Sequence, residues 1–270
     1  MTHRILELYS GIGGMHCAWK DSGIPGTTVA AVDINTVAND VYKHNFPETN
    51  LLNRNIQSIK PEEIKKMNIN IILMSPPCQP FTRNGKFLDK NDPRTNSFTY
   101  LLDILSQLDS VEYILMENMN RLPKDYDDPF MLSEIIEENV PERYLISDKL
   151  LKRANIFDIC YKDSRRSCCF TKAYTHYVEG TGSVFTEASP ETVDNCYKEA
   201  NTHEVGSPDF VSTLKDLKLR FFTPKEVSQL MAFPKSYEFP KNISIKQCYR
   251  LLGNSVNIKV ISELLKILVD

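Results

Sequence analysis

The chain has 270 residues, of which 41% are hydrophobic and 25% charged, so it can bury a sizeable core and need not be disordered. No apolar run approaches the roughly 20 residues that cross a bilayer, and no secretory signal pattern opens the sequence. We therefore expect a protein of the cytoplasm, with the nucleus as a second compartment, and no membrane partner. The net charge of −3 excludes general electrostatic adhesion to nucleic acid, so binding of that kind needs a local patch.

The first part of the sequence alternates short apolar runs with segments of helical spacing. This β-α-β order predicts a parallel sheet covered by helices. The expected strands are 4–9, 28–32, 69–74 and 112–116, and the expected helices are 15–22, 36–45 and 95–108. The predicted fold class is therefore α/β, a doubly wound, Rossmann-like sheet that binds a nucleotide.

The regular pattern weakens after Asn118. Residues 123–129 form an acidic, proline-bracketed stretch that is typical of a loop or linker. Residues 143–184 are basic and aromatic, with strand-like pieces at 168–171 and 174–178. These changes predict a second, smaller module.

Local charge and helix signals divide the rest of the chain. Between residues 143 and 172, eight Lys or Arg stand against three Asp, which indicates either a nucleic-acid surface or an ordinary solvated face. Thr223 and Glu226 form a capping box around Pro224 and predict the start of a helix. We expect a nucleotide-binding domain at 1–142, a smaller second module at 143–222, and a C-terminal part at 223–270 that returns to the first domain.

The segment Ser10-Gly-Ile-Gly-Gly14 forms a glycine-rich loop between the first expected strand and helix. Glycines let the backbone approach a nucleotide closely, and Asp33, about 20 residues further on, is placed to bind ribose hydroxyls. The loop departs from G-x-G-x-x-G, and Tyr9 offers an aromatic surface rather than a pyrophosphate cradle. We therefore expect S-adenosylmethionine (AdoMet) rather than NAD; the alternative is a plain turn with a helix-capping or exposed Asp33.

The loop Ser75-Pro-Pro-Cys-Gln-Pro80 places Cys78 at the carboxyl end of a buried strand, where ligands bind in open α/β sheets. A lone cysteine is usually an inert buried side chain. The prolines stiffen this loop, however, and a positioned nucleophile requires a rigid loop. Glu117 ends the next strand at the same edge, where a carboxylic acid can act as a proton donor; a half-exposed structural acid is the alternative. The seven cysteines form no C-x-x-C pair or histidine cluster, so neither a metal nor a disulfide framework is predicted.

A cysteine, an acid and an AdoMet site together indicate methylation at carbon 5 of cytosine. Carbon 5 is too poor a nucleophile to take a methyl group unaided. A thiolate that adds to carbon 6, while an acid protonates N3, turns the base into an enamine that can attack the sulfonium methyl. The base must first leave its stack, so the expected substrate is a flipped or looped-out cytosine.

Five motifs occur in order: Glu7-Leu-Tyr-Ser-Gly-Ile-Gly-Gly-Met15, Val32-Asp-Ile-Asn35, Ser75-Pro-Pro-Cys-Gln-Pro-Phe-Thr82, Glu117-Asn118 and Gly253-Asn-Ser-Val-Asn257. Through them, nearly the whole chain resembles the cytosine-5 methyltransferases. Cys169-Phe-Thr-Lys-Ala-Tyr174, Glu179-Gly-Thr-Gly-Ser183 and Arg250-Leu-Leu-Gly-Asn-Ser255 resemble the DNA-methyltransferase-like tRNA (cytosine-5) methyltransferases. The resemblance implies AdoMet as cofactor, S-adenosyl-L-homocysteine as product, and the position-38 cytosine in the anticodon loop of tRNA-Asp as target.

The resemblance also assigns roles to residues. Cys78 resembles the family's nucleophile and Glu117 its N3 proton donor. The positions that match the AdoMet pocket are Tyr9, Ile12, Gly13, Gly14, Asp33, Ile34, Asn55, Ile56, Ser75, Pro77, Asn254 and Ser255. Those that match the target-recognition signature are Cys169, Phe170, Thr171 and Lys172, and the basic stretch around them is the expected RNA surface.

The chain departs from the family after Asn118. The family continues there through two more strands and an Arg-x-Arg motif that helps to hold the cytosine, and this block is missing before Cys169. Either the protein has lost it, or the 270 residues join segments that are separate in a longer chain. We favour the second interpretation, because an open hydrophobic sheet edge promotes aggregation.

Three functions stay open. The first is a tRNA methyltransferase, and the second is a DNA cytosine-5 methyltransferase, which shares every catalytic motif. The Cys-Phe-Thr region and the small target module favour tRNA. The third is a catalytically silent RNA-binding member of the fold, which the intact Cys78 and Glu117 oppose and the missing arginine motif supports.

Overall fold

The computed structural model describes residues 2–76, 96–117, 130–177 and 179–269. The chain forms two compact units by its internal contacts. The first unit consists of Met1–Leu122, Met231–Ile243 and Ser255–Asp270, and the second of Pro123–Leu230 and Ser244–Asn254. No helix in the described ranges is long and apolar enough to cross a membrane.

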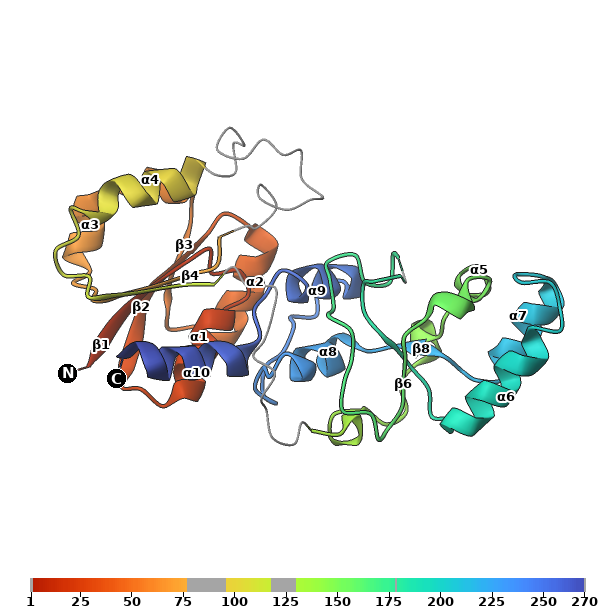
Figure 1. The fold of residues 1–270 in the computed structure, drawn as a ribbon. Coiled ribbons are helices and arrows are strands. Elements are labelled where there is room, and N and C mark those ends of the chain that lie inside the picture. Colours follow the sequence, from red (N-terminus) through yellow and green to blue (C-terminus); the bar gives the residue numbers. More distant parts are fainter. Residues whose placement is uncertain (1, 77–95, 118–129, 178, 270) are drawn as a thin grey trace. The chain divides into compact units, whose positions relative to one another are not determined.

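The first unit is built on a sheet of five parallel strands in the order β3-β2-β1-β4-β5 (Figure 1). The strands are β1 (His3–Leu8), β2 (Gly26–Asp33), β3 (Asn50–Asn53), β4 (Ile71–Met74) and β5 (Tyr113–Met116). The helices are α1 (Gly14–Ser22), α2 (Thr36–Asn45), α3 (Pro61–Lys66), α4 (Asn96–Leu105) and α10 (Ile258–Val269). The strand order reverses between β1 and β4, which is where open α/β sheets bind ligands at their carboxyl edge.

The sequence prediction of an α/β fold is confirmed, and the helix predicted at 36–45 matches α2 at both ends. Two elements were missed. β3 is a four-residue strand with asparagine at both ends, and α3 buries only Ile64. Neither has enough apolar residues to show a period of two or of 3.6.

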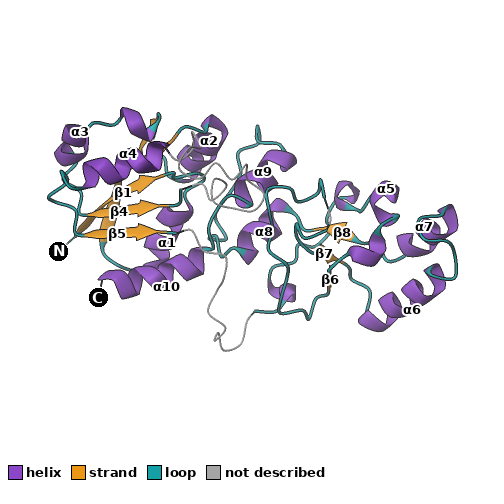
Figure 2. Ribbon diagram, turned by 45° about the horizontal axis from the view of Figure 1, so that its top comes forward, coloured by secondary structure: helices purple, strands orange, loops and turns teal. Residues whose placement is uncertain are grey.

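Helices cover both faces of the sheet (Figures 1 and 2). α3 and α4 lie over one face and enclose a core that includes Leu6, Leu8, Ala30, Val32, Ile72, Met74, Leu101 and Ile104. α1 and α10 lie over the other face. Because side chains alternate along a strand, Glu7 points away from Leu6 and Leu8, toward the face that carries α1. The sheet thus places one buried carboxyl group directly before the glycine-rich loop.

β5 is the edge strand of this sheet in the described part of the chain. Its side chains alternate in exposure, and Ile114 and Met116 are 37% and 46% exposed. Residues 118–129, where the family block is missing, lie outside the described ranges. From 130 onward, the described chain adds no strand to the five-stranded sheet.

The second unit holds a three-stranded sheet in the order β6-β7-β8, with β6 and β7 parallel and β7 and β8 antiparallel. Its strands are β6 (Ile159–Cys160), β7 (Val184–Phe185) and β8 (Arg220–Phe221). Its helices are α5 (Asp148–Leu151), α6 (Pro190–Ala200), α7 (Pro208–Lys215), α8 (Pro224–Leu230) and α9 (Ile245–Leu252). Since each strand has two residues, the core is built from side chains of helices and loops as well as strands, and its largest members are the aromatic residues Tyr174, Phe185, Phe210 and Phe222.

The strands predicted at 168–171 and 174–178 were wrong for the residues described. Residues 168–171 are irregular, and 172–177 form turns around an isolated bridge between Tyr174 and Tyr177. The chain folds back there, because the Thr171 N–H donates to the Thr181 carbonyl at 2.9 Å and Thr175 has a left-handed φ of 71°. A β-branched residue rarely adopts that conformation, so the sequence favoured a strand.

The predicted domain boundaries differ from the compact units. Residues 130–142 belong to the second unit, where the Leu132 N–H donates to the Ser164 carbonyl and the Glu137 N–H to Glu226 Oε1, both at 2.9 Å. α8 and α9 belong there too, so only 231–243 and 255–270 return to the first unit. The predicted capping box of α8 is present: the Glu226 N–H donates to Thr223 Oγ1 at 3.1 Å, and the Thr223 N–H to Glu226 Oε2 at 2.7 Å.

Candidate active site

The glycine-rich loop follows β1 and turns sharply, with φ values of 53° at Tyr9, 51° at Gly11 and 86° at Gly13. Asp33, at the end of β2, holds this loop in place. Its Oδ2 accepts from the Gly11 N–H and its Oδ1 from the Asn35 N–H, each at 2.8 Å. Asp33 therefore has a structural role, and its oxygens keep further lone pairs that a ribose hydroxyl can use.

The surroundings of this loop fit a nucleoside. Among the described residues, a side chain added at Gly11 would meet only the Tyr9 carbonyl oxygen, at 4.0 Å, so these residues leave space beside the loop. The Ser10 hydroxyl is buried and has no hydrogen-bond partner among the described residues. Ile34, next to Asp33, is 67% exposed and offers an apolar surface. Space, an unpaired hydroxyl and an apolar face beside a carboxylate are what a ribose and an adenine ring would use.

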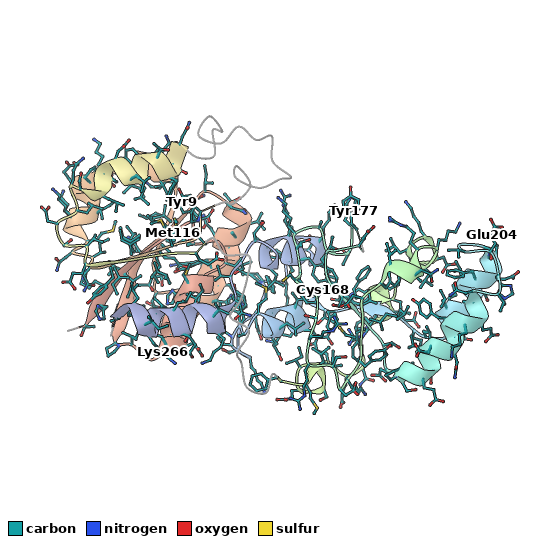
Figure 3. All side chains as sticks on the ribbon, in the orientation of Figure 1. Tyr9, Met116, Cys168, Tyr177, Glu204 and Lys266 are labelled. Atoms are coloured by element: carbon teal, nitrogen blue, oxygen red, sulfur yellow. The ribbon has the colours of Figure 1, made fainter. Side chains whose placement is uncertain are left out.

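Tyr9 and Ser75, both predicted to line the cofactor pocket, lie together. The Tyr9 hydroxyl hydrogen-bonds the Ser97 hydroxyl of α4 at 2.9 Å, and the Ser75 hydroxyl donates to the Tyr9 carbonyl at 3.4 Å (Figure 3 labels Tyr9). The loop after β1 is thus joined to the loop after β4. This contact places the start of the Ser-Pro-Pro-Cys segment beside the glycine-rich loop.

Glu117 lies at the same edge of the sheet. Its N–H donates to the Met74 carbonyl at 3.0 Å, one residue before Ser75, because β4 and β5 pair in register. The Glu117 side chain is half-buried. Pro77 and Cys78 lie outside the described residues, and the structure follows this loop to Pro76. The predicted proton donor is therefore located next to the strand that leads to the predicted nucleophile.

Two predicted cofactor residues have structural contacts of their own. Asn55 Oδ1 accepts from the Gln57 N–H at 2.9 Å and caps the short 3-10 helix Ile56–Ser58. The Ile56 side chain is 5% exposed and belongs to the core beneath α3 and α4. Their role toward a cofactor stays a prediction.

A buried network beneath the loop was not predicted from the sequence. The Tyr42 hydroxyl of α2 donates to Glu7 Oε2 at 2.8 Å, and the same hydroxyl oxygen lies 2.8 Å from His16 Nδ1. The backbone N–H of His16, in α1, donates to Glu7 Oε1 at 3.3 Å. Phe46 stacks on the His16 ring with centroids 3.8 Å apart. The only sequence signal of this buried network is Glu7, an acid in a strand whose residues 5, 6 and 8 are apolar.

Burial changes the protonation of this network. Glu7 is fully buried, which raises its pKa from 4.5 to about 8, and the nearby Asp33 carboxylate raises it further against the opposing effect of the Tyr42 hydrogen bond. Burial lowers the pKa of His16 to about 3, with a smaller contribution from Lys20. At neutral pH both groups are therefore uncharged.

Two further contacts support the loop from the C-terminal part of the first unit. The buried Tyr237 hydroxyl donates to the Ile12 carbonyl at 2.6 Å. Gly14 lies so close to Ser255 and Val256 that an added side chain would meet the Ser255 hydroxyl at 2.8 Å. Ser255, predicted to line the cofactor pocket, thus packs against Gly14, the first residue of α1. Tyr237 was not predicted, because it is 225 residues away from Ile12 in the sequence and no local pattern marks it.

The target-recognition signature lies in the second unit. Cys169 and Lys172 are exposed, and Phe170 packs edge-on against Tyr174 with centroids 4.9 Å apart. Gly253 lies directly against the backbone of Thr171 and Lys172, and a side chain at this position would overlap them. Asn254, predicted to line the AdoMet pocket, is exposed and adjoins this contact.

Comparison with known proteins agrees with this geometry. Residues 3–158 and 131–270 match the family described as C-5 cytosine-specific DNA methylase. The chain is similar to a tRNA (cytosine(38)-C(5))-methyltransferase of Spodoptera frugiperda, with 57% identity over 332 aligned positions covering 100% of both proteins. A protein of the same name from Mus musculus is 35% identical, covering 99% of this chain and 93% of the relative. A crystal structure of a Spodoptera frugiperda DNMT2 mutant superposes with a TM-score of 0.91, at 56% identity and 100% coverage of both chains.

The Spodoptera alignment has 62 positions more than this chain has residues, so at least that many residues of the relative have no counterpart here. The family match nevertheless takes in both units, from residue 3 to residue 270. It includes the glycine-rich loop, the Ser-Pro-Pro-Cys segment and the C-terminal Gly-Asn-Ser loop. The chain therefore belongs to the C-5 cytosine-specific DNA methylase family.

Proposed function

We propose that the protein transfers a methyl group from AdoMet to carbon 5 of the position-38 cytosine in the anticodon loop of tRNA-Asp, through a covalent Cys78 adduct. Membership of the family supports the cytosine-5 chemistry. The names of the Spodoptera and mouse relatives support tRNA and position 38, and the resemblance of the Cys-Phe-Thr signature supports tRNA-Asp. The observation that carries the proposal is the meeting of the glycine-rich loop, Asp33, Ser75 and Glu117 at one sheet edge.

The residues divide the work between binding and proton transfer. The loop around Gly11, the Ser10 hydroxyl and Asp33 would hold AdoMet, which supplies an electrophilic methyl group. The Cys78 thiolate adds to carbon 6 of cytosine while Glu117 gives a proton to N3, and carbon 5 becomes nucleophilic enough to accept the methyl group. A base such as solvent water then takes the carbon-5 proton, the Cys78 thiolate leaves carbon 6, and the N3 proton returns to Glu117, which restores the aromatic ring and the enzyme groups.

One observation favours a second function. At least 62 residues of the Spodoptera relative have no counterpart here, and β5 ends the described sheet with two exposed apolar side chains. A chain that lacks part of the catalytic sheet can keep a fold for binding RNA and lose the reaction. A catalytically silent RNA-binding protein is therefore the alternative.

Methyl transfer from tritiated AdoMet to transcribed tRNA-Asp tests both functions. The wild-type chain should label one cytosine, and Cys78→Ala should abolish labelling while still binding both ligands. Glu117→Gln should slow the reaction by roughly a hundredfold, as loss of a general acid does. Cys196→Ala removes a half-buried thiol of the second unit and serves as the matched control.

A substrate with 5-fluorocytosine at the target position tests the adduct, because fluorine cannot leave carbon 5 as a proton does. The wild-type chain should be trapped covalently and Cys78→Ala should not. Binding of tRNA without labelling would favour the silent protein, and faster labelling of duplex DNA would overturn the tRNA assignment. Normal activity in Cys78→Ala would overturn the proposed mechanism.

A further inference from the structure

A tight loop of the second unit, Thr171–Tyr177, is closed by its own backbone; we call it the aromatic loop. The Tyr174 N–H donates to the Thr171 carbonyl at 3.0 Å. The N–H groups of His176 and Tyr177 both donate to the Ala173 carbonyl, at 3.0 and 3.1 Å. Thr181 closes the base of the loop, since it accepts from the Thr171 N–H and its hydroxyl donates to the Tyr177 carbonyl. These bonds fix the direction in which the loop presents its side chains.

The aromatic loop is also anchored to the core. Tyr174 is 3% exposed, and its hydroxyl donates to the Ser183 carbonyl at 2.7 Å and accepts from the Phe222 N–H at 2.9 Å. Its ring meets Phe221 and Tyr249 edge-on, with centroids 5.2 and 5.1 Å apart. The loop is therefore a rigid projection of the core rather than a free surface segment.

His176 and Tyr177 form the outer end of this loop. Tyr177 is 59% exposed and projects away from the ribbon of its unit (Figure 3). The centroids of the His176 and Tyr177 rings are 4.5 Å apart at an interplanar angle of 75°, so the two rings meet edge to face and His176 supports Tyr177. Burial does not explain the position of Tyr177, because most of its surface faces solvent.

Strain accompanies this exposure. Thr175, which links the anchored Tyr174 to the exposed pair, has a φ of 71°. A β-branched residue in the left-handed region costs on the order of 1–2 kcal/mol, and strain of this kind is concentrated at ligand sites. The strained turn brings an aromatic ring to the surface instead of into the core, which is unfavourable unless the ring has a partner.

The charge around the loop fits a polyanion. Lys172 is exposed within it, and along the sequence eight Lys or Arg stand against three Asp between residues 143 and 172. Three of these basic groups are exposed and form ion pairs, Arg166 with Asp158, Lys162 with Glu187 and Arg153 with Glu179. Glu179 is the acidic group closest in sequence, and Arg153 pairs with it at 3.3 Å with both side chains well exposed. Exposed basic groups beside an exposed aromatic ring are the combination that binds single-stranded nucleic acid, through phosphates and stacked bases.

We propose that Tyr177, supported by His176, is a stacking platform for an unstacked base in a single-stranded loop of the RNA substrate. The inference rests on the proposed function, because it takes RNA as the ligand. Sequence-specific RNA recognition uses loops whose bases can be turned out onto aromatic rings, and each stacked base contributes about 1–3 kcal/mol. Duplex RNA keeps its bases stacked internally and offers nothing to such a ring.

Binding of two fluorescently labelled RNAs to the full chain tests the platform. One is a hairpin with the anticodon-loop sequence of tRNA-Asp, and the other is a blunt duplex of equal length. The wild-type chain should prefer the hairpin. Tyr177→Ala and Tyr177→Leu should weaken hairpin binding by about 5- to 100-fold and leave duplex binding unchanged. Tyr177→Phe and Tyr177→Trp should keep the preference, because stacking needs the ring and not the hydroxyl.

Phe130→Ala is the matched control, since Phe130 is another exposed aromatic residue of the same unit, at 79% exposure, outside the aromatic loop. It should bind both RNAs as the wild-type chain does. A 2-aminopurine base in the hairpin loop should change its fluorescence with wild type and not with Tyr177→Ala. Unfolding midpoints should stay equal throughout, because position 177 is exposed.

Three results would overturn the platform: no wild-type preference for the hairpin, unchanged binding in Tyr177→Ala, or a loss in Tyr177→Phe as large as in Tyr177→Ala. Methyl transfer by the wild-type chain is measured in parallel. A chain that shows the predicted binding series without methyl transfer would retain the platform and refute the proposed reaction. Methyl transfer with normal binding by Tyr177→Ala would refute the platform alone.

Discussion

The two units are held together by different kinds of contact. In the first, strands of four to eight residues pair through their backbones, and no single side chain is needed for that pairing. In the second, each strand has two residues, and buried side chains add long-range hydrogen bonds to the backbone ones, such as those of Tyr174 and Tyr249 with the backbone of Phe222. The second unit should therefore be more sensitive to single polar substitutions.

The largest effect is expected from Arg220→Met in the second unit. Arg220 makes two hydrogen bonds to the fully buried Glu226, at 2.7 and 2.8 Å, and Glu226 in turn accepts from the Glu137 N–H. Removal of one partner from a buried ion pair leaves an unpaired charge and costs about 3–5 kcal/mol. Hydrogen exchange should accelerate throughout the second unit.

The same variant tests whether the two units unfold separately. Trp19, the single tryptophan, is buried in α1 of the first unit, so its fluorescence during urea unfolding reports that unit. That transition should not move in Arg220→Met. Arg153→Met, which breaks the exposed pair with Glu179, is the control and should change stability by less than about 1 kcal/mol. A shift of the Trp19 transition equal to the loss in the second unit would show that the units do not unfold separately.

The next effect is a pH dependence of the first unit, caused by Glu7. Its pKa is about 8 in the folded protein and near 4.5 when exposed, so between these values the folded protein keeps a proton that the unfolded chain has released. The Glu7 contribution to stability should therefore be lost as pH rises from about 4.5 to about 8, at roughly 1.4 kcal/mol per pKa unit. Burial lowers the pKa of His16 from 6.5 to about 3, so His16 adds stability as pH rises to about 6.5 and offsets the Glu7 loss there. The net loss should therefore appear between about pH 6.5 and 8 and amount to about 2 kcal/mol.

Glu7→Gln removes this titration and should abolish the loss of stability between about pH 6.5 and 8, so the variant should be more stable than wild type at pH 9. Gln keeps the size and the accepting oxygen for the His16 N–H. Glu48→Gln, an exposed glutamate of the same unit, should leave the slope unchanged. The Trp19 transition in urea at several pH values measures both. An unchanged slope in Glu7→Gln would show that Glu7 is ionised in the folded protein at neutral pH.

A smaller effect is expected for stability when each of two glycines of the first unit is replaced by alanine. Gly13 and Gly23 have left-handed φ values of 86° and 73°, so alanine is strained at either by about 1–2 kcal/mol. A side chain at Gly23 would meet no atom of the described residues within 4 Å, whereas one at Gly13 would come within 2.5 Å of the Phe46 ring. Gly13→Ala should therefore cost a further 1–3 kcal/mol or so and weaken AdoMet binding in calorimetry, while Gly23→Ala should leave AdoMet binding intact. Equal losses of stability would contradict the packing described for Gly13.

The smallest effect compares one hydroxyl in each unit. The Tyr249 hydroxyl donates to the Phe222 carbonyl at 2.5 Å, and the Tyr100 hydroxyl donates to the Ile59 carbonyl at 2.6 Å. Tyr249 is 3% exposed, so Tyr249→Phe leaves a buried carbonyl without that partner and should cost about 1 kcal/mol. Tyr100 is half-buried, so water can replace its hydroxyl and Tyr100→Phe should cost only a few tenths. A larger loss from Tyr100→Phe would reverse the comparison between the units.

The sequence predicted most of the first unit because its elements carry periodic apolar patterns. β1, β4 and α2 each show them, and the glycine-rich loop and Asp33 were found from their place after two strands. The supports of that loop were not predictable in the same way. Tyr42 and Tyr237 reach Glu7 and Ile12 through tertiary contacts, which no local period encodes.

Prediction was weaker in the second unit. Two-residue strands such as β7 have no measurable period, and the left-handed Thr175 opposes the usual preference of a β-branched residue. The capping box at Thr223 and Glu226 was found because it is a local signal with a fixed spacing. Glu226 also binds Arg220 and the Glu137 N–H, and that second use could be seen only in the folded chain.

α10 has a consequence for the timing of folding. Ile258, Ile261 and Leu265 of this helix are buried in the first unit, where α10 packs on α1 and contacts β5, yet α10 follows the entire second unit in the sequence. At roughly 5–20 residues per second, a ribosome needs on the order of 10 s to make the chain between β5 and α10. During that interval the α1 face of the sheet carries α1 but not α10, so the apolar surface that α10 covers stays exposed. We therefore expect the nascent first unit to bind chaperones until the second unit has been synthesised.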